Sequence, residues 1–132
     1  MPYYIGLRRT IFWIIALVLI IAAGIISRAL HTGSILIDKY AGDALYAAMF
    51  YAIFRLTAPN KNAAILAMAL MTALEFFQLT LIPLHMLASP NLLVHVAARL
   101  LGTTFSWFDL AAYVIGIAAI TLLDRIRNRY VR

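Results

Sequence analysis

The sequence has no cysteine, and only 12% of its residues are charged. Without cysteine the chain can form neither a disulfide nor a thiolate metal site, so its redox compartment stays open. With so little charge, a chain of 132 residues that is 65% hydrophobic has too little polar surface to cover a soluble globule. We therefore expect lipid to be its solvent and residues 1–132 to form a single membrane domain.

Long apolar stretches mark four candidate membrane spans, at about 11–26, 36–56, 62–82 and 107–123. Each is close to the roughly 20 residues that a helix needs to cross the hydrocarbon layer, and helices satisfy their own backbone hydrogen bonds in lipid. The first stretch also resembles a signal peptide, but no small-x-small cleavage site follows it. The sequence predicts an all-α fold, a four-helix transmembrane bundle.

A fifth segment, at about 90–101, is too short to cross and lies between the third and fourth spans. Ser89 is expected to cap this helix, with Pro90 in its first turn and Gly102 as its stop. The pattern is typical of an interfacial helix or of a re-entrant one.

A polar stripe runs along this short helix, because Asn91, His95 and Arg99 recur every four residues. Two orientations are open. The stripe either faces water, or it brings His95 and Arg99 inward over the acidic residues described below.

The basic residues are distributed unevenly between the two sides of the expected bundle. With the N-terminus inside, eight fall on the inner side and three on the outer side, a positive-inside bias that places both termini in the cytoplasm. Because they flank apolar segments and form no basic face, the net charge of +6 does not predict a nucleic-acid partner. The inner group is Arg8, Arg9, Arg55, Lys61, Arg125, Arg127, Arg129 and Arg132, and the outer group is Arg28, Lys39 and Arg99.

Three acidic residues, Asp43, Glu75 and Asp109, lie within or at the mouth of an apolar stretch. A carboxylate there costs roughly 2.5–3.5 kcal/mol on insertion scales, so it usually has a partner or a task. The expected topology brings all three to the outer side, with Glu75 roughly 10 Å below the end of its helix. Gln78 shares a helix face with Glu75, and Lys39 is four residues before Asp43 and could pair with it.

Each of these residues also has a plainer interpretation. Asp109 follows Ser106 with the spacing of a capping box, and Asp43 could be an ordinary interfacial residue. Trp107 could shield a lipid head, but an aromatic belt explains it equally well. Glu75 is the hardest to explain by structure alone, and it could be a functional group or a buried structural hydrogen bonder.

No pattern of residues predicts an enzyme, a cofactor or a metal site. His, Asp and Glu show no dense spacing on one helix, and the sequence contains no nucleotide-binding loop or serine nucleophile elbow. His95 or Glu75 could act as a general base on a lipid-linked substrate, but no constellation assigns that chemistry. Ala112 and Gly116, four residues apart, predict instead a close contact between helices.

Three short motifs resemble the small bacterial VanZ-like membrane proteins: DKYAGD at 38–43, EFFQ at 75–78 and FSWFDLAAYVIG at 105–116. They resemble more closely an uncharacterised sister group, a domain of unknown function with a GDA start and a SWxDL close. The resemblance covers about residues 36–120, with Tyr113 where VanZ-like proteins usually have asparagine. It implies a bacterial inner-membrane protein linked to the cell envelope or to glycopeptide susceptibility, with no agreed reaction.

From these features we expect a polar pocket that opens outward and binds the head of an envelope lipid or a lipid-linked glycan. Glu75 and Gln78 would form its centre, and Arg99 would contact phosphate. The predicted ligand-binding residues are Asp43, Glu75, Gln78, His95, Arg99, Trp107 and Asp109.

Two other functions stay open at this point. Ion- or proton-coupled transport would use Glu75 as the carrier, although the inner halves of the helices hold no second acid before Asp124. An accessory role beside a larger membrane protein needs only the bundle and its small-residue face. A protein partner or a second copy of the chain is therefore an alternative to a lipid partner.

Overall fold

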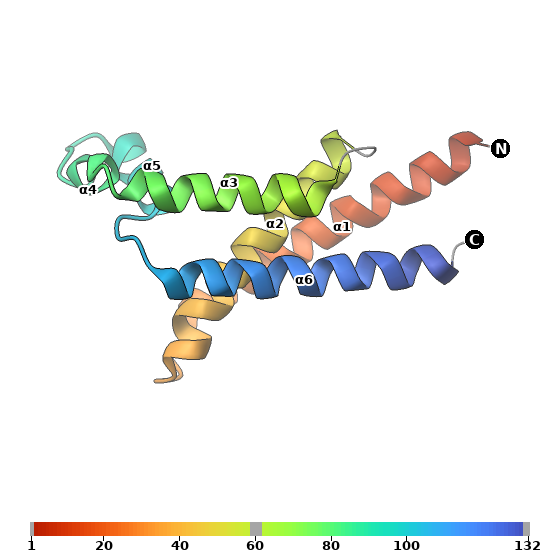
Figure 1. Cartoon of the computed structure of the whole chain (residues 1–132), viewed down its shortest axis with the longest axis horizontal. Coiled ribbons are helices and arrows are strands. Elements are labelled where there is room, and N and C mark those ends of the chain that lie inside the picture. Colours follow the sequence, from red (N-terminus) through yellow and green to blue (C-terminus); the bar gives the residue numbers. More distant parts are fainter. Residues whose placement is uncertain (1, 59–61, 131–132) are drawn as a thin grey trace.

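The computed structural model describes residues 2–58 and 62–130, and all the regular structure in these residues is helical (Figure 1). The all-α prediction is confirmed. Lys61 and Arg132, two of the eight basic residues expected on the inner side of the membrane, lie outside the described residues. The elements are α1 (Pro2–Ala29), the π-helix η1 (Leu36–Ala41), α2 (Gly42–Thr57), α3 (Ala63–Gln78), α4 (Ile82–Met86), α5 (Leu92–Leu101) and α6 (Trp107–Tyr130).

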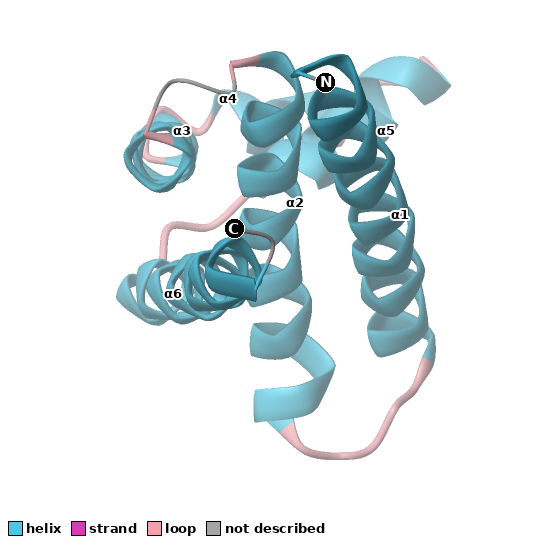
Figure 2. Ribbon diagram, turned by 90° about the vertical axis from the view of Figure 1, so that its right-hand side faces the viewer, coloured by secondary structure: helices cyan, strands magenta, loops and turns pink. Residues whose placement is uncertain are grey.

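The central helix of the assembly is α2, which packs against α1, α3 and α6. Figure 1 shows α3 and α6 running alongside each other while α1 and α2 cross them obliquely, and Figure 2 views α3 and α6 nearly end-on. Both termini lie at one end of the assembly, and α4 and α5 lie at the opposite end (Figure 1). One end of the assembly therefore carries the ends of the chain, and the other carries the short helices α4 and α5.

Among the described residues, two helices are long and apolar enough to cross a membrane, judged by length and composition alone. They are Gly6–Ala29 within α1 and Trp107–Tyr130, which is α6. Core helices of soluble proteins and signal sequences can meet the same criteria. In α1, however, only 6% of the most apolar window is buried inside the protein, so α1 is not an interior helix of this fold.

The third predicted span, 62–82, is too long, because α3 ends at Gln78. Leu81 adopts a left-handed backbone conformation with φ 61°, which stops the helix. Pro83 has no N–H to donate, and its ring would clash with a helical carbonyl four residues earlier. The chain therefore turns and starts the short helix α4, which the sequence patterns did not predict.

The remaining boundaries also differ from the predictions in detail. Helix α5 begins at Leu92, and its cap is Asn91 rather than the predicted Ser89. The Asn91 side-chain oxygen accepts from the backbone N–H of Leu93 at 2.9 Å and of Val94 at 3.4 Å. The long helices α1 and α6 extend beyond the predicted spans 11–26 and 107–123.

Small residues allow α2 to pack closely against its neighbours. Ala47, Ala48 and Ala52 on α2 are buried with Trp13 of α1. A side chain at Gly116 of α6 would overlap the backbone of Ala44 on α2, at its carbonyl oxygen. The close helix contact predicted from the small residues of α6 is therefore present, and it joins α6 to α2.

Candidate functional site

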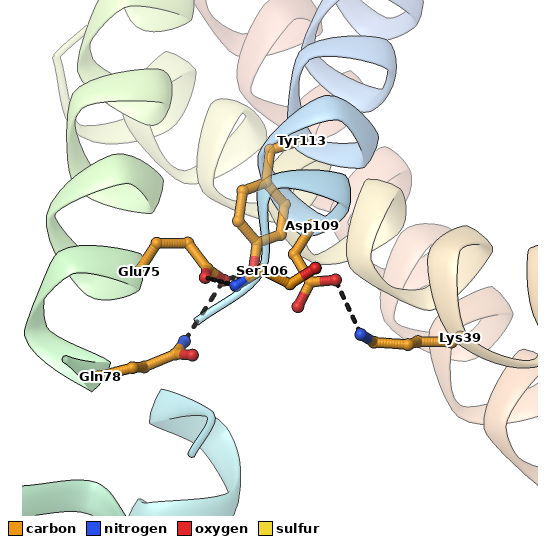
Figure 3. A network of polar contacts seen from close by, with 6 residues as sticks. All are labelled: Lys39, Glu75, Gln78, Ser106, Asp109 and Tyr113. Atoms are coloured by element: carbon orange, nitrogen blue, oxygen red, sulfur yellow. Dashed lines mark hydrogen bonds and ion pairs between the residues drawn. The ribbon is translucent and has the colours of Figure 1, made fainter. Parts of the chain in front are cut away.

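Glu75 is fully buried near the end of α3, and its carboxylate accepts three hydrogen bonds (Figure 3). The Tyr113 hydroxyl donates to Oε1 at 2.6 Å, and the Ser106 backbone N–H donates to Oε2 at 3.2 Å. Gln78 Nε2 donates to Oε1 at 3.3 Å. A carboxylate with three donors is tolerated in an apolar interior, and this one ties α3 to α6 and to the segment before it.

Asp109 forms an ion pair with Lys39, with 2.8 Å between Nζ and Oδ1 (Figure 3). The predicted pairing of Lys39 with Asp43 is therefore wrong, since the amine reaches α6 instead. The capping box is also wrong, because the backbone N–H of Ser106, which Asp109 would have to bind, donates to Glu75. The ion pair between Lys39 and Asp109 joins η1 to the start of α6.

Among the described residues, two buried oxygens in this region have neither a hydrogen-bond partner nor an ion-pair partner: Asp43 Oδ2 and Gln78 Oε1. The Gln78 amide nitrogen donates to Glu75 and, at 3.0 Å, to the backbone carbonyl of Leu101, so neither bond engages its oxygen. Buried acceptors without donors are costly, typically by about 1–3 kcal/mol each. They are the atoms at which a ligand with N–H or O–H groups gains most.

These residues surround one cavity of about 520 Å³. The carboxylates that line it are Asp38, Asp43, Glu75 and Asp109, and the basic side chains that line it are Arg28, Lys39 and Arg99. The carboxylate of Glu75 is fully buried, whereas the Lys39 side chain is 46% exposed and both arginines are exposed. The cavity thus has a floor of acceptors and a rim of cations.

Asp38 stands apart from the other carboxylates, because it closes the loop before η1. It accepts hydrogen bonds from the backbone N–H and the hydroxyl of Thr32, and from the N–H of Gly33. Its oxygens are therefore occupied by the chain itself, and we assign it a structural task.

Of the two inward-facing candidates on α5, the structure brings only Arg99 to the cavity. Arg99 Nε donates to Nε2 of His95 at 3.2 Å, and the other ring nitrogen of His95 lies 3.0 Å from the carbonyl of Leu87. With Nε2 accepting, Nδ1 must carry the proton and donate. His95 therefore positions Arg99 and does not line the cavity.

Trp107 is also absent from the lining of the cavity. Its side chain is 70% exposed and packs edge-on against Phe105 with ring centroids 5.0 Å apart. This placement fits an aromatic at a membrane interface better than a shield over a bound head. Arg28, which the sequence suggested only as a topology signal, lines the cavity instead.

A second polar cluster, which sequence reasoning missed, lies at the end that carries the termini. Asp124 is buried on α6, pairs with Arg55 of α2 at 3.0 Å and accepts from the Tyr51 hydroxyl at 2.8 Å. Asn128 donates to its other oxygen at 3.2 Å. Tyr51 and Arg55 are four residues apart on α2, and that spacing was the available signal. The cluster joins α2 to α6.

The chemistry open to the cavity depends on how its polar side chains are already engaged. Within residues 2–58 and 62–130, no group of three or more His, Cys, Asp or Glu side chains is placed to hold a metal ion. Glu75 has its oxygens engaged by three donors, and both ring nitrogens of His95 have partners, so neither is poised as a general base. Cations at the rim and unpaired acceptors at the floor suit a ligand that carries both an anionic group and hydrogen-bond donors.

A family model described as "Protein of unknown function (DUF2809)" matches residues 32–117. That range contains every cavity carboxylate, together with Lys39, Gln78, Arg99 and Tyr113, but neither Arg28 nor Asp124. No curated protein and no solved structure matches the chain. The expected likeness to a domain of unknown function is confirmed, and the match shows no link to the VanZ-like proteins.

Proposed function

The chain belongs to the family of proteins of unknown function DUF2809, and we propose its function from the geometry of its own cavity. We propose that the protein binds the polar head of a membrane lipid, or of a lipid-linked glycan, in that cavity. The observation that carries the proposal is a grouping of charge. Besides the structural Asp38, three of the chain's five acidic residues and three of its basic residues line one cavity of about 520 Å³.

The polarity of the cavity defines the ligand further. Arg28 and Arg99 at the rim suit a phosphate, because guanidinium groups present fixed pairs of donors to its oxygens. The unpaired oxygens of Asp43 and Gln78 at the floor need donors. A head with a phosphate and, beyond it, hydroxyl or amine groups would satisfy both sets of side chains.

The proposal places the chain in a bilayer as one membrane domain with four spans, α1, α2, α3 and α6. The exposed face of α1 supports this placement, because Val18 and Leu19 are each at least 60% exposed and would otherwise face water. At 1.5 Å per residue α3 measures about 24 Å, shorter than the hydrocarbon layer of ~30 Å. We infer that its polar end, with Glu75, lies at or below the membrane surface.

The proposed orientation has both termini in the cytoplasm and the cavity facing outward. It is supported by the bias of basic residues and by the position of the cavity, whose α5 lies at the end opposite the termini (Figure 1). The motifs that resemble VanZ-like proteins supply Lys39, Glu75 and Asp109 to the cavity. That resemblance favours a bacterial cytoplasmic membrane and a ligand from the cell envelope.

Ion- or proton-coupled transport is less well supported by the geometry. The two polar clusters around Glu75 and Asp124 lie on either side of a core whose described buried members include Ala48, Met71 and Ile117. Apolar side chains at that depth give a proton or an ion no sequence of partners. The cavity therefore suits a site that opens to one side.

Loss of retained lipid in two cavity variants is the expected result that tests the proposal. In Asp43→Ala the floor loses an acceptor, and in Arg99→Ala the rim loses a cation, so each should weaken lipid binding at least about tenfold. Native mass spectrometry of gently extracted protein would measure the fraction that carries a discrete lipid or glycan mass. Both residues lie outside the hydrogen-bond network of Glu75, so both variants should fold.

The matched control is Arg8→Ala, which removes a basic, exposed side chain at the opposite end. It should keep the wild-type lipid mass. Equal lipid occupancy in the wild type and both cavity variants would contradict the proposal. A stoichiometric second polypeptide in place of a lipid would favour the accessory role.

A further inference from the structure

The cavity is not polar throughout, because it continues from the charged rim along α1 and α2. Apolar side chains line this continuation, and Gly24 lies among them. The apolar lining residues are Ile20, Ile21, Ile25, Leu45 and Met49. We call this part of the cavity the apolar slot.

The spacing of the lining residues shows the direction of the slot. On α1 they recur between Ile20 and Arg28 on one face, and on α2 they recur between Gly42 and Met49 on one face. Arg28 lies eight positions after Ile20, roughly 12 Å along the helix axis. The slot thus leads from the charged rim towards the middle of the assembly, along α1 and α2.

Gly24 lies on the face of α1 that lines the slot, and it leaves space there. A Cβ atom added at this position would meet nothing within 4 Å. The other apolar residues of α1 that line the slot are bulky, because residues 20, 21 and 25 are all isoleucine. The glycine therefore gives the slot width at a point between its apolar end and its charged rim.

We propose that the slot holds the hydrocarbon chain of the same lipid whose head occupies the polar end of the cavity. This inference rests on the proposed head-binding function and adds the class of ligand to it: an amphiphile with a phosphate-bearing head and a chain that lies along α1 and α2. Acyl and prenyl chains share this chemistry. The continuity of one cavity from charged rim to apolar slot selects this occupant over a separate peptide or a detached small molecule.

The slot acts by shape more than by hydrophobic driving force. A chain that leaves bulk lipid for the slot exchanges one hydrocarbon environment for another, so the transfer itself contributes little. Its path nevertheless fixes where the attached head can reach. A blocked slot would hold the head away from the floor and forfeit its polar contacts.

Replacing Gly24 by phenylalanine is the decisive change. The glycine has open space around it, so the variant should fold, but the ring would fill the slot. The probes are phosphatidylethanolamine, phosphatidylglycerol, cardiolipin and a long-chain prenyl phosphate, supplied together in mixed micelles and read by native mass spectrometry. We expect the lipid that the wild type retains to bind Gly24→Phe at least about tenfold more weakly. The retained mass also distinguishes acyl from prenyl chains.

Gly6→Phe is the matched control, because Gly6 lies on the same helix, outside the slot, with nothing within 4 Å of an added Cβ. Gly24→Ala should keep its lipid, since a methyl group leaves most of the slot open. Full lipid retention by Gly24→Phe, together with loss in Asp43→Ala, would overturn the slot and leave the head site standing. A wild-type protein that retains none of the four probes would overturn both.

Discussion

Replacing Gly116 by alanine is expected to destabilise the helix assembly severely. The added methyl group would overlap the backbone of Ala44 on α2, which cannot rotate away as a flexible side chain can. Overpacking in well-packed interiors costs typically 1–3 kcal/mol, and a backbone collision lies at the upper end, about 3 kcal/mol. Thermal unfolding of the detergent-solubilised protein, followed by circular dichroism, would show a large fall in the midpoint temperature.

The control for this prediction is Gly24→Ala, a substitution with the same chemistry on α1. The added methyl group meets nothing within 4 Å, so the midpoint should stay unchanged or rise slightly as the helix backbone loses freedom in the unfolded state. Equal midpoints for Gly116→Ala and the wild type would mean that α2 and α6 do not approach as closely as described.

Replacing Glu75 by alanine should produce the second large loss of stability. The Tyr113 hydroxyl and the Ser106 N–H would both lose the carboxylate that accepts from them. Each buried donor left without an acceptor costs about 1–3 kcal/mol, and water that enters from the cavity offsets part of this. We expect a net loss of about 2–4 kcal/mol in the free energy of unfolding.

Two milder variants separate this effect from a simple change of volume. Tyr113→Phe removes only one donor, so it should cost about 1 kcal/mol. Glu75→Gln keeps an oxygen that can accept from the Tyr113 hydroxyl and should lie between the wild type and Glu75→Ala. If Glu75→Ala unfolded at the wild-type midpoint in the same assay, Glu75 would not be the acceptor that ties α3 to α6.

Part of the cavity lining could be predicted from the sequence, because some of its residues lie close together on one helix. Glu75 and Gln78 share a helix face through their spacing, and the distribution of basic residues predicted that their end of α3 lies beside Asp43 and Asp109. The family-like motif at 105–116 contains Tyr113, but nothing in the sequence predicted that its hydroxyl donates to Glu75. The spacing on one helix is a short-range pattern that helix geometry converts directly into positions in space, whereas the basic residues predict only the direction in which each helix runs.

The pairing of side chains from different helices could not be predicted, because it depends on how distant segments of the chain pack. Lys39 lies in η1, whose π-helical winding rotates the following residues relative to an α-helix, and its amine reaches Asp109 rather than Asp43. The Tyr51–Asp124 contact joins residues 73 positions apart. Sequence spacing on one helix carries no information about such pairs, so the buried cluster around Asp124 could not be predicted.

The most direct test of the central claim is photo-crosslinking from two positions on α5. Leu100 and Leu92 are both exposed, by 60% and 74%, but only Leu100 lines the cavity. A photoreactive amino acid at each position would be activated in membranes that contain the protein, and the mass of the adduct would identify the attached lipid. The account predicts one lipid species enriched at Leu100 and the bulk lipid composition at Leu92. Bulk composition at both positions would contradict a specific lipid site in this cavity.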